Sequence, residues 1–578
     1  MSRRTVTTWL CTVKRTASLI SLGLGGWTRG QAIRIAAGLW LAALFLWNAP
    51  VHARPPKLVL FITVDALGSD LLLRMRPRLH GGLAQILSEG AFFPNTYYQY
   101  AETVTAPGHA TLATGANPWR HGIVGNTTFN TASGRWEAAF EDPDHPAHGI
   151  SETWAGSSPD RLLAETVSDH LRLDSQSRSK SIAISVKARA AIALAGKSGQ
   201  AWWFQTDAGE FTTGTYYAKE LPGWVKVFNA KRIPEQYFTR QWTLFGPGEE
   251  YIGADDRPFE SERYGLGRTF PHPLDGAQPT PGPQSHWALA VSPYMNDVLV
   301  QFAKAAMEAE QLGRHPTADL LSISFSSTDY TYHFFGPYSW ESQDAMLRLD
   351  ASLAELISAA QKAAGGSANL LVVLTADHGG MAIPEELASE GVTSIRVDQA
   401  RLQQGLTAAL QAQFGANLLA GLSVTRVYLE PKAIAARRVD PAAARRFAAH
   451  WLSQQAPVAL AVARDDLSSG PPGAGYLSML QKGHHPERGG DVLFILKPFH
   501  LLTEGKTGTS HGSPYGYDSQ VPFALLGKGV KPGLYLQKIH TVDIAPTVAA
   551  LLEMGAPAMA EGTPRAEAIA PAQPPRIR

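Results

Sequence analysis

Residues 58–64 read LVLFITV, a run of large and β-branched apolar side chains that ends directly at Asp65. A run of this kind, without alternating polar residues, is typical of a strand that is buried on both faces of a parallel sheet. Similar runs occur at 320–325 (LLSISF) and 370–374 (LLVVL). The three runs predict the centre of a mostly parallel sheet.

Amphipathic helical patterns surround these runs. Two of them flank the second run, so the local order is helix, strand, helix, strand, which favours an α/β fold. We therefore expect a largely parallel central sheet that is covered by helices on both faces. The predicted helices span residues 160–171, 296–311 and 344–363.

The composition is that of a globular protein with a large core. The chain has 578 residues, of which 44% are hydrophobic and 17% are charged, so it is not of the disordered class. Lys and Arg number 51 and Asp and Glu number 50. This balance gives no electrostatic reason to expect nucleic acid as a specific partner.

The N-terminal segment has the pattern of an export signal. An apolar run at 35–47 follows Arg29 and Arg34 and precedes small residues near Ala53, which is typical of a cleaved leader. We expect residues 1–53 to be removed, no stable membrane insertion after cleavage, and a periplasmic or secreted protein. An uncleaved anchor or a start codon placed too early are the alternatives. Cys11 is the single cysteine, so the mature chain would have no thiol chemistry.

The rest of the chain is expected to hold a single catalytic domain at 54–562. Segments at about 198–290 and about 381–500 differ in sequence composition from the strand-rich parts, and we interpret them as insertions that form a cap. The second includes a predicted strand at 491–496. The Ala- and Pro-rich residues 563–578 are expected to be disordered.

An aspartate follows each of the three core runs within a few residues. These residues are Asp65, Asp329 and Asp377. Any one of them could cap a helix or open a turn. Three together at the carboxyl ends of parallel strands, where ligands collect in open sheets, indicate a functional site.

Histidines accompany two of these aspartates. His378 follows Asp377 directly, and His333 lies four residues after Asp329, which places both side chains on one side of a helical turn. His511 lies in a loop of small residues, SHGS. Carboxylate and imidazole groups are zinc ligands, and three of each would suffice for two zinc ions.

Thr105 is the candidate nucleophile. It lies at the start of a short helical pattern, with Pro107 suited to the first turn. Free N–H groups at such a position favour a bound phosphate. An ordinary threonine N-cap is the alternative. We interpret the neighbouring His109, and His484 and His485, as structural or surface residues.

With these motifs the chain resembles the alkaline phosphatase superfamily, in the branch of type I phosphodiesterases, nucleotide pyrophosphatases and threonine-nucleophile bacterial alkaline phosphatases. The resemblance covers most of the mature chain. It is carried by VDALGSD (64–70), TVTAPGHATLATG (103–115), HGIVGN (121–126), VKAR (186–189), STDYTYHFFGP (327–337), TADHGGM (375–381), TSHGSPYGYDSQVP (509–522) and TVDIAPTVAALL (541–552).

The resemblance implies a role for each site residue. It implies an alkaline-phosphatase-like fold with two Zn²⁺ per chain and a phosphothreonine intermediate on Thr105. Asn126, Lys187 and Arg189 would bind the phosphoryl group. One zinc would be held by Asp329, His333 and His511, and the other by Asp65, Asp377, His378 and the Thr105 oxygen.

The Lys-x-Arg pair at 187 and 189 favours monoesters over diesters, because a monoester carries an additional charged oxygen. The expected function is zinc-dependent hydrolysis of small phosphate monoesters to alcohol and phosphate. A phosphodiesterase or nucleotide pyrophosphatase on the same metal site is the first alternative, and an exported zinc- or phosphate-binding protein without turnover is the second. A sulfatase is disfavoured because such relatives form their nucleophile from Cys or Ser in a different motif and no cysteine remains in the mature chain, and a phosphoglycerate mutase is disfavoured by the leader.

Overall fold

In the computed structural model, the opening run forms strand β1 (Leu58–Val64), and every one of its residues is buried. On its two sides it pairs in parallel with β10 (Asp319–Phe325) and β11 (Leu370–Thr375). All three predicted core strands are confirmed. Because they run in parallel, Asp65, Asp329 and Asp377 come after the same edge of the sheet.

The central sheet continues on both sides of these strands. It is parallel from β6 to β11, and antiparallel pairing occurs at β7 and at β18. In the described part of the chain ten strands take part, with β20 (Ile539–His540) paired to β2. The order is β19 (Gly533–Leu534), β2 (Ala91–Tyr97), β18 (Gln520–Gly527), β11, β1, β10, β5 (Ser181–Ser185), β6 (Gln200–Gln205) and β7 (Glu210–Thr212).

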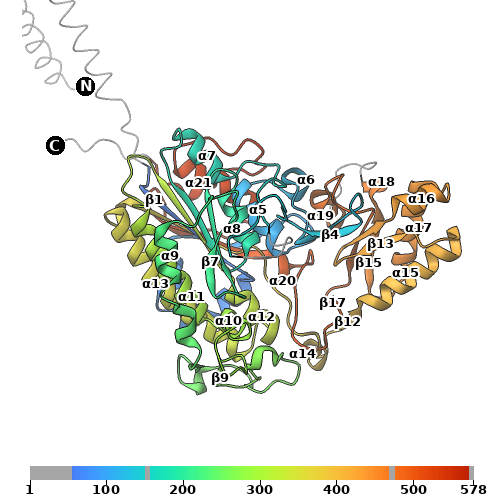
Figure 1. Ribbon diagram of the computed structural model, residues 1–578, viewed down its shortest axis with the longest axis horizontal. Helices are drawn as coiled ribbons and strands as arrows, with labels where there is room; N and C mark the ends of the chain where they lie inside the picture. The colour runs from blue at the N-terminus through green and yellow to red at the C-terminus, as the bar shows by residue number, and fades with distance from the viewer. Residues whose placement is uncertain (1–54, 150–155, 468–474, 572–578) are drawn as a thin grey trace, which may run out of the picture. The chain divides into compact units, whose positions relative to one another are not determined.

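Helices cover both faces of this sheet (Figure 1), as the α/β prediction requires. The largest is α13 (Trp340–Ala364), whose apolar side packs on β1 and β11. Its face of the sheet also holds α3 (Ser69–Met75), α4 (Gly82–Glu89), α9 (Gly223–Asn229) and α11 (Tyr294–Ala309). The other face holds α5 (Thr105–Thr114), α6 (Pro118–His121), α7 (Val167–Asp174), α8 (Ala188–Ala195) and α21 (Ile544–Leu551).

One predicted helix is displaced. The helix expected at 160–171 begins only at Val167, because Thr166 and Asp169 form a capping box in which each side chain binds the backbone N–H of the other residue. Residues before this cap form turns. The helices predicted at 296–311 and 344–363 are present as α11 and α13.

The segment at about 198–290 starts inside the central sheet. Its first residues form β6 and β7, in which Trp202 and Trp203 are buried, so this part belongs to the sheet and not to an insertion. Aromatic side chains fill these outer sheet positions well. The remainder is mainly loops with α9, α10 (Pro283–Val291) and the short pair β8 (Gln241–Trp242) and β9 (His272–Pro273).

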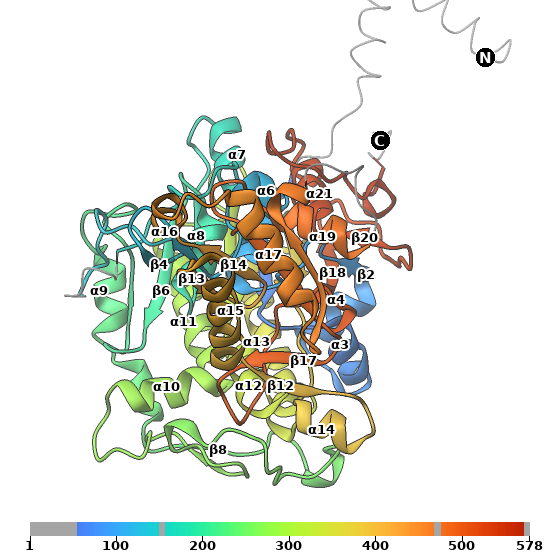
Figure 2. The same ribbon diagram turned by 90° about the vertical axis from the view of Figure 1, so that its right-hand side faces the viewer.

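The segment at about 381–500 contains a second sheet with helices beside it (Figure 2), and this part has its own apolar core. We call this sheet and its helices the cap. The predicted strand at 491–496 is β16 (Val492–Leu496). Around it lie β13 (Leu419–Leu422), β14 (Arg426–Leu429), β15 (Val458–Ala463), α15 (Gln399–Phe414), α16 (Pro431–Ala436), α17 (Pro441–Ser453), α18 (Arg464–Leu467) and α19 (Tyr476–Gly483).

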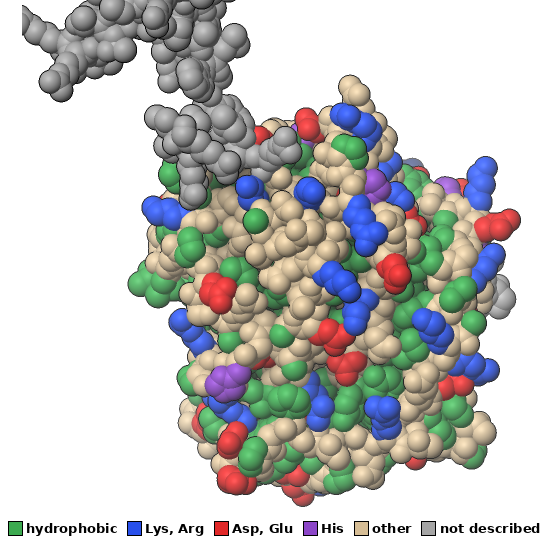
Figure 3. All heavy atoms as spheres, turned by 90° about the vertical axis from the view of Figure 1, so that its left-hand side faces the viewer, with side chains coloured by type: hydrophobic (Ala, Val, Ile, Leu, Met, Phe, Trp, Pro, Cys, Tyr) green, Lys and Arg blue, Asp and Glu red, His purple; other side chains and the backbone are tan. Residues whose placement is uncertain are grey.

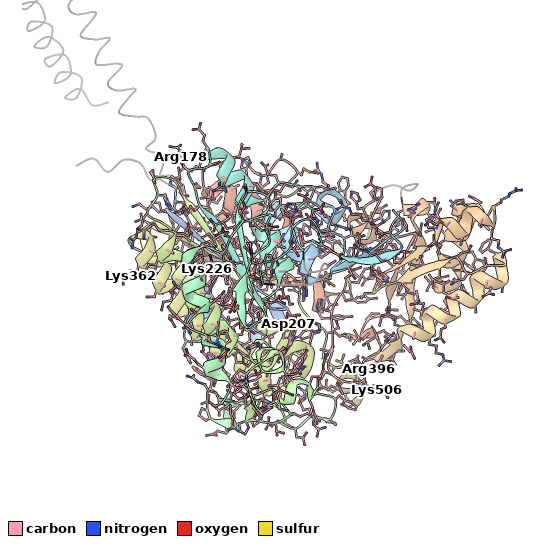
Figure 4. The ribbon with its side chains drawn as sticks, in the orientation of Figure 1. Arg178, Asp207, Lys226, Lys362, Arg396 and Lys506 are labelled. Carbon is pink, nitrogen blue, oxygen red and sulfur yellow. The ribbon has the colours of Figure 1, made fainter. Side chains whose placement is uncertain are left out.

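The two chain segments that connect the cap are tied together. Strand β12 (Ile395–Asp398), after α14 (Pro384–Ser389), pairs with β17 (His500–Thr503). Arg396, labelled in Figure 4, donates to the carbonyl of Gly508 at 2.6 Å and binds both oxygens of Glu385. A hairpin of the catalytic part, β3 (Thr127–Asn130) and β4 (Arg135–Ala138), extends toward the cap, where Trp136 contacts Tyr428 edge to face.

The structure describes residues 55–149, 156–467 and 475–571, so the export signal expected at 1–53 lies outside it. Part of the expected disordered tail is ordered. Ala568 is fully buried and Ile569 forms a bridge to Val530, because the tail packs on the edge of the central sheet; residues 572–578 are not described. Among the described residues, none of the helices is apolar over a length that would span a bilayer. On the face drawn in Figure 3, acidic and basic side chains are interspersed.

Candidate active site

Two clusters of carboxylate and imidazole groups lie at the carboxyl edge of the central sheet. In the described part of the chain, these are the groups whose ligand atoms lie within 4.8 Å of one another. One cluster comes from α12 (Ser327–Phe335) and a loop, and the other from the ends of β1 and β11. Their members are Asp329, His333 and His511, and Asp65, Asp377 and His378. The structure thus brings together all six predicted ligands in the predicted groups.

The histidine rings are oriented by backbone carbonyls. Nδ1 of His333 lies 2.9 Å from the carbonyl of Thr509, and Nδ1 of His511 lies 2.8 Å from that of Thr103. Nδ1 of His378 contacts the carbonyl of Gly379 at 2.8 Å. Because each Nδ1 donates its proton to a carbonyl, the Nε2 atoms are the ones that face the carboxylates. This is the usual arrangement of metal-binding histidines.

The facing atoms lack hydrogen bonds. Among the described residues, Oδ1 of Asp65, one oxygen each of Asp329 and Asp377, and Nε2 of His378 are buried without a hydrogen-bond partner, and Oδ2 of Asp65 faces the ammonium group of Lys187. Buried polar atoms are normally paired, and such a set of oxygen and nitrogen donors fits a divalent cation. The two clusters therefore form a metal-binding site.

The pKa values show how strongly the clusters are coupled. Burial lowers the pKa of His378, but the carboxylates of Asp377 and Asp65 outweigh burial and raise the pKa to about 9. Burial, and the cationic His378 ring next to it, hold the pKa of His511 well below its ordinary value. Burial and the neighbouring Asp65 raise the pKa of Asp377. The clustered carboxylates therefore outnumber the cationic side chains beside them, as expected where metal ions bind.

Thr105 is the first residue of α5 and is buried at this edge. The helix starts here because Val104 is extended and Pro107 fits the first turn, as predicted. Gly108 allows the helix to approach the metal site, since a side chain there would lie 2.4 Å from the carbonyl of Asp377. The Thr105 hydroxyl thus lies at a helix N-terminus beside both clusters.

Lys187 and Arg189 both reach the Thr105 hydroxyl. Nζ of Lys187 lies 3.5 Å from Oγ1 of Thr105, and Nη2 of Arg189 lies 3.4 Å from the same atom. Lys187 follows β5 and caps α8, and Arg189 lies in the first turn of that helix. Burial lowers the pKa of Lys187, but the carboxylates of Asp329 and Asp65 raise it above its ordinary value, so the ammonium group stays charged.

Asn126 lies beside the same helix end. Its side-chain oxygen accepts a hydrogen bond from the backbone N–H of Ala106 at 2.8 Å. This contact fixes the amide next to Thr105 and leaves its NH₂ group free to donate to a ligand oxygen. The structure therefore places all three predicted phosphoryl-binding residues next to Thr105.

Several contacting residues were not predicted. His109, interpreted as structural, is fully buried and lies 3.2 Å from Oδ2 of Asp377. Tyr330 places its ring 5.0 Å from Nζ of Lys187. The position of His109, four residues after Thr105 on one helix face, was the signal that could have revealed its place in the site. Tyr330, directly after Asp329, gave no comparable signal.

A cavity of about 850 Å³ opens beside the predicted phosphoryl-binding side chains. It offers space for the organic part of an ester next to the nucleophile. Asp207, labelled in Figure 4, follows β6 at its rim. Its lining includes Asn126, Arg189, Glu141, Trp203, Asp207 and Trp287.

Comparison with known proteins gives consistent matches along the chain. Residues 59–518 match the family model described as type I phosphodiesterase / nucleotide pyrophosphatase. A protein of Myroides odoratus named calcium-transporting ATPase is 34% identical over 89% of this chain and 95% of its own length. Alkaline phosphatase PhoV of Synechococcus elongatus is 34% identical over 88% of this chain and 92% of its own.

A solved structure supports the fold. The crystal structure of wild-type alkaline phosphatase PafA is similar with a TM-score of 0.84 and 31% sequence identity. The match covers 89% of this chain and 99% of that one. The similarity therefore extends over the central sheet and the cap, and confirms the alkaline-phosphatase-like α/β fold.

Proposed function

This chain belongs to the type I phosphodiesterase / nucleotide pyrophosphatase family, and we propose that it is a two-zinc phosphatase that hydrolyses phosphate monoesters through Thr105. It is a hydrolase with bacterial alkaline phosphatases among its relatives. Its substrates are small phosphate esters, and its products are an alcohol and inorganic phosphate.

The observation that carries this proposal is the convergence of Lys187 and Arg189 on the Thr105 hydroxyl, at 3.5 Å and 3.4 Å. A phosphoryl group transferred to Thr105 would meet both cations. A monoester carries two negative charges there, whereas a diester carries one and needs room for a second organic group. Two cations at the nucleophile therefore favour the monoester.

The donor set fits zinc, because carboxylate and imidazole are both zinc ligands and the imidazole groups disfavour magnesium and calcium. Asp329, His333 and His511 would hold one ion, and Asp65, Asp377, His378 and the Thr105 oxygen the other. When bound, the ions supply Lewis acidity that lowers the pKa of the Thr105 hydroxyl and stabilises the leaving oxygen.

The chain's own residues position the reaction. The Thr105 hydroxyl gives up its proton to solvent, and Oγ1 attacks phosphorus while the bond to the leaving oxygen breaks. The leaving oxygen takes up a proton from solvent, so the products of this step are phosphothreonine and the alcohol. Lys187, Arg189 and the NH₂ group of Asn126 donate to the three remaining phosphoryl oxygens, and the dipole of α5 favours their negative charge. A water molecule then attacks the phosphothreonine, releases phosphate and restores the Thr105 hydroxyl. Two displacements in line give overall retention at phosphorus.

A phosphodiesterase on the same site is the second candidate, favoured by the description of the matching family model. A binding protein without turnover is the candidate of another class. The place of action that we propose is periplasmic or secreted, which rests on the leader pattern at 1–53.

The test is steady-state hydrolysis of p-nitrophenyl phosphate beside bis-p-nitrophenyl phosphate, with zinc, for the wild type, Thr105→Ala and Thr114→Ala. Thr114 is a buried threonine of the same helix whose hydroxyl binds within the helix, so it controls for packing. We expect a monoester preference that Thr105→Ala abolishes and Thr114→Ala retains. A diester preference supports the second candidate, and wild-type inactivity on both esters supports the third.

A further inference from the structure

Arg426, the first residue of β14 in the cap, is a large side chain with only 2% exposure. Its guanidinium group contacts the catalytic part of the chain. Nη1 forms an ion pair with Glu102, and Nη2 donates to the carbonyl of Val124 at 2.7 Å. Arginine suits this position because its planar fork serves two acceptors at once.

Glu102 lies three residues before Thr105 and is 5% exposed. The hydroxyl of Thr425, next to Arg426 in the cap, donates to the same carboxylate oxygen. On the other side lies Gly125, where a side-chain Cβ would be 2.6 Å from Oε1 of Glu102. The carboxylate is therefore enclosed by the cap and by the segment that leads to Asn126.

The two segments bound by Arg426 both lead to the reaction centre. In the first, the carbonyl of Thr103 accepts from Nδ1 of His511, at 2.8 Å. In the second, Val124 lies two residues before Asn126, whose oxygen binds the N–H of Ala106. One guanidinium group thus contacts both the segment that precedes Thr105 and the segment that precedes Asn126. The first of these segments also binds the ring of His511.

We propose that Arg426 is a positioning residue, which fixes the geometry of Thr105 and Asn126 from the cap through Glu102 and Val124. The inference rests on the proposed function, because it assigns the positioned groups their catalytic roles. The cap then contributes directly to turnover, and does more than shape the entrance. Small displacements of a nucleophile lower rates strongly, because reacting atoms must be held in near-attack geometry.

The test compares kcat and KM for p-nitrophenyl phosphate, with saturating zinc, in Arg426→Met, Glu102→Gln and the double variant. We expect each single variant to lower kcat about tenfold or more, with a smaller change in KM. Because the two side chains act as one unit, the kcat of the double variant should be no lower than that of the less active single variant. Arg426→Lys keeps the charge but loses the fork, and should retain an intermediate kcat.

Arg445→Met is the matched control. Arg445 is also a nearly buried cap arginine, and it binds both oxygens of Asp465 at 2.6 Å and 2.8 Å, within the cap. This variant should lower the melting temperature of the protein yet leave kcat within about twofold of the wild type. If Arg426→Met fails to fold, Arg426→Lys and Glu102→Gln carry the comparison.

Two results overturn the inference in distinguishable ways. If Arg426→Met has a lower melting temperature, as the control does, but keeps the wild-type kcat, the ion pair only stabilises the cap. If the wild type does not hydrolyse the monoester, or Thr105→Ala retains its activity, the proposed function fails first and the inference fails with it.

Discussion

The Nζ atom of Lys187 lies 2.6 Å from Oδ2 of Asp65, and both side chains are buried. The same ammonium group pairs with Asp329. It therefore touches one carboxylate from each ligand cluster while it also reaches the Thr105 hydroxyl. One side chain links charge balance at the metal site to recognition of the phosphoryl group, and this dual contact has measurable consequences.

Lys187→Met should destabilise the metal-free protein. Without the ammonium group, Asp65 and Asp329 are left as buried carboxylates without a cation, which costs about 3–5 kcal/mol in the free energy of unfolding. Bound zinc should compensate for much of this loss. Chemical unfolding with and without zinc measures both values.

The matched control is Lys304→Met, which removes an exposed lysine paired with Glu355. Its effect on the free energy of unfolding should stay below about 1 kcal/mol, with or without zinc. An equal loss in both variants, or a loss in Lys187→Met that zinc does not reduce, would contradict the account.

Arg189→Ala should reduce the monoester preference. The guanidinium group donates to a charged phosphoryl oxygen, and loss of such a hydrogen bond costs about 1.5–3 kcal/mol, or about 10- to 150-fold in kcat/KM for p-nitrophenyl phosphate. The diester lacks one charged oxygen, so its kcat/KM should change less. The ratio of the two constants is the measurement, with exposed Arg178→Ala as control; an unchanged ratio would exclude Arg189 from phosphoryl binding.

Chelation should remove activity and stability together. Because the ligand clusters contain buried atoms without hydrogen bonds, metal-free protein should have a lower melting temperature and no turnover. Readdition of zinc should restore both, at two ions per chain by elemental analysis. Restoration by magnesium but not by zinc would contradict the assignment, since magnesium prefers oxygen ligands alone.

His121 should make the protein sensitive to acid. Burial lowers its pKa to about 3, from an ordinary value of 6.5, and Nδ1 accepts a hydrogen bond from the N–H of Ile123. Below pH 6.5 the unfolded chain binds a proton that the folded chain does not. Stability is therefore unaffected by this group above pH 6.5, and it falls by up to about 1.4 kcal/mol per pH unit between pH 6.5 and 3.

The test is the dependence of the free energy of unfolding on pH between pH 7.5 and 5, measured with zinc present. In His121→Gln the slope should be smaller than in the wild type, and in the exposed control His450→Gln it should be unchanged. Equal slopes in all three proteins would show that His121 does not titrate on unfolding.

The sequence predicted the parts of the site that depend on local patterns. Buried apolar runs identified β1, β10 and β11, and the residues after them identified Asp65, Asp329 and Asp377. The spacing of Asp329 and His333 gave a shared helical face, which α12 confirms. These features are local because one strand or one turn of helix determines them.

Features that depend on distant contacts were missed. Glu102 and Arg426 are separated by 324 positions, and neither belongs to a recognisable motif. Burial of charged side chains follows from tertiary pairing and has no pattern of its own. In contrast, β6 was available from the sequence: QAWWFQ is a strand-like aromatic run, and the surrounding Gly and Pro residues obscured it.

The central claim is covalent catalysis by Thr105, and acid quenching of the enzyme during turnover of p-nitrophenyl phosphate tests it most directly. Mass spectrometry of the peptide that contains Thr105 should show one added phosphoryl group on that residue, and the signal should vanish in Thr105→Ala together with turnover. Thr105→Ala that turns over at the wild-type rate, or a phosphoryl group carried by another residue, would contradict the account.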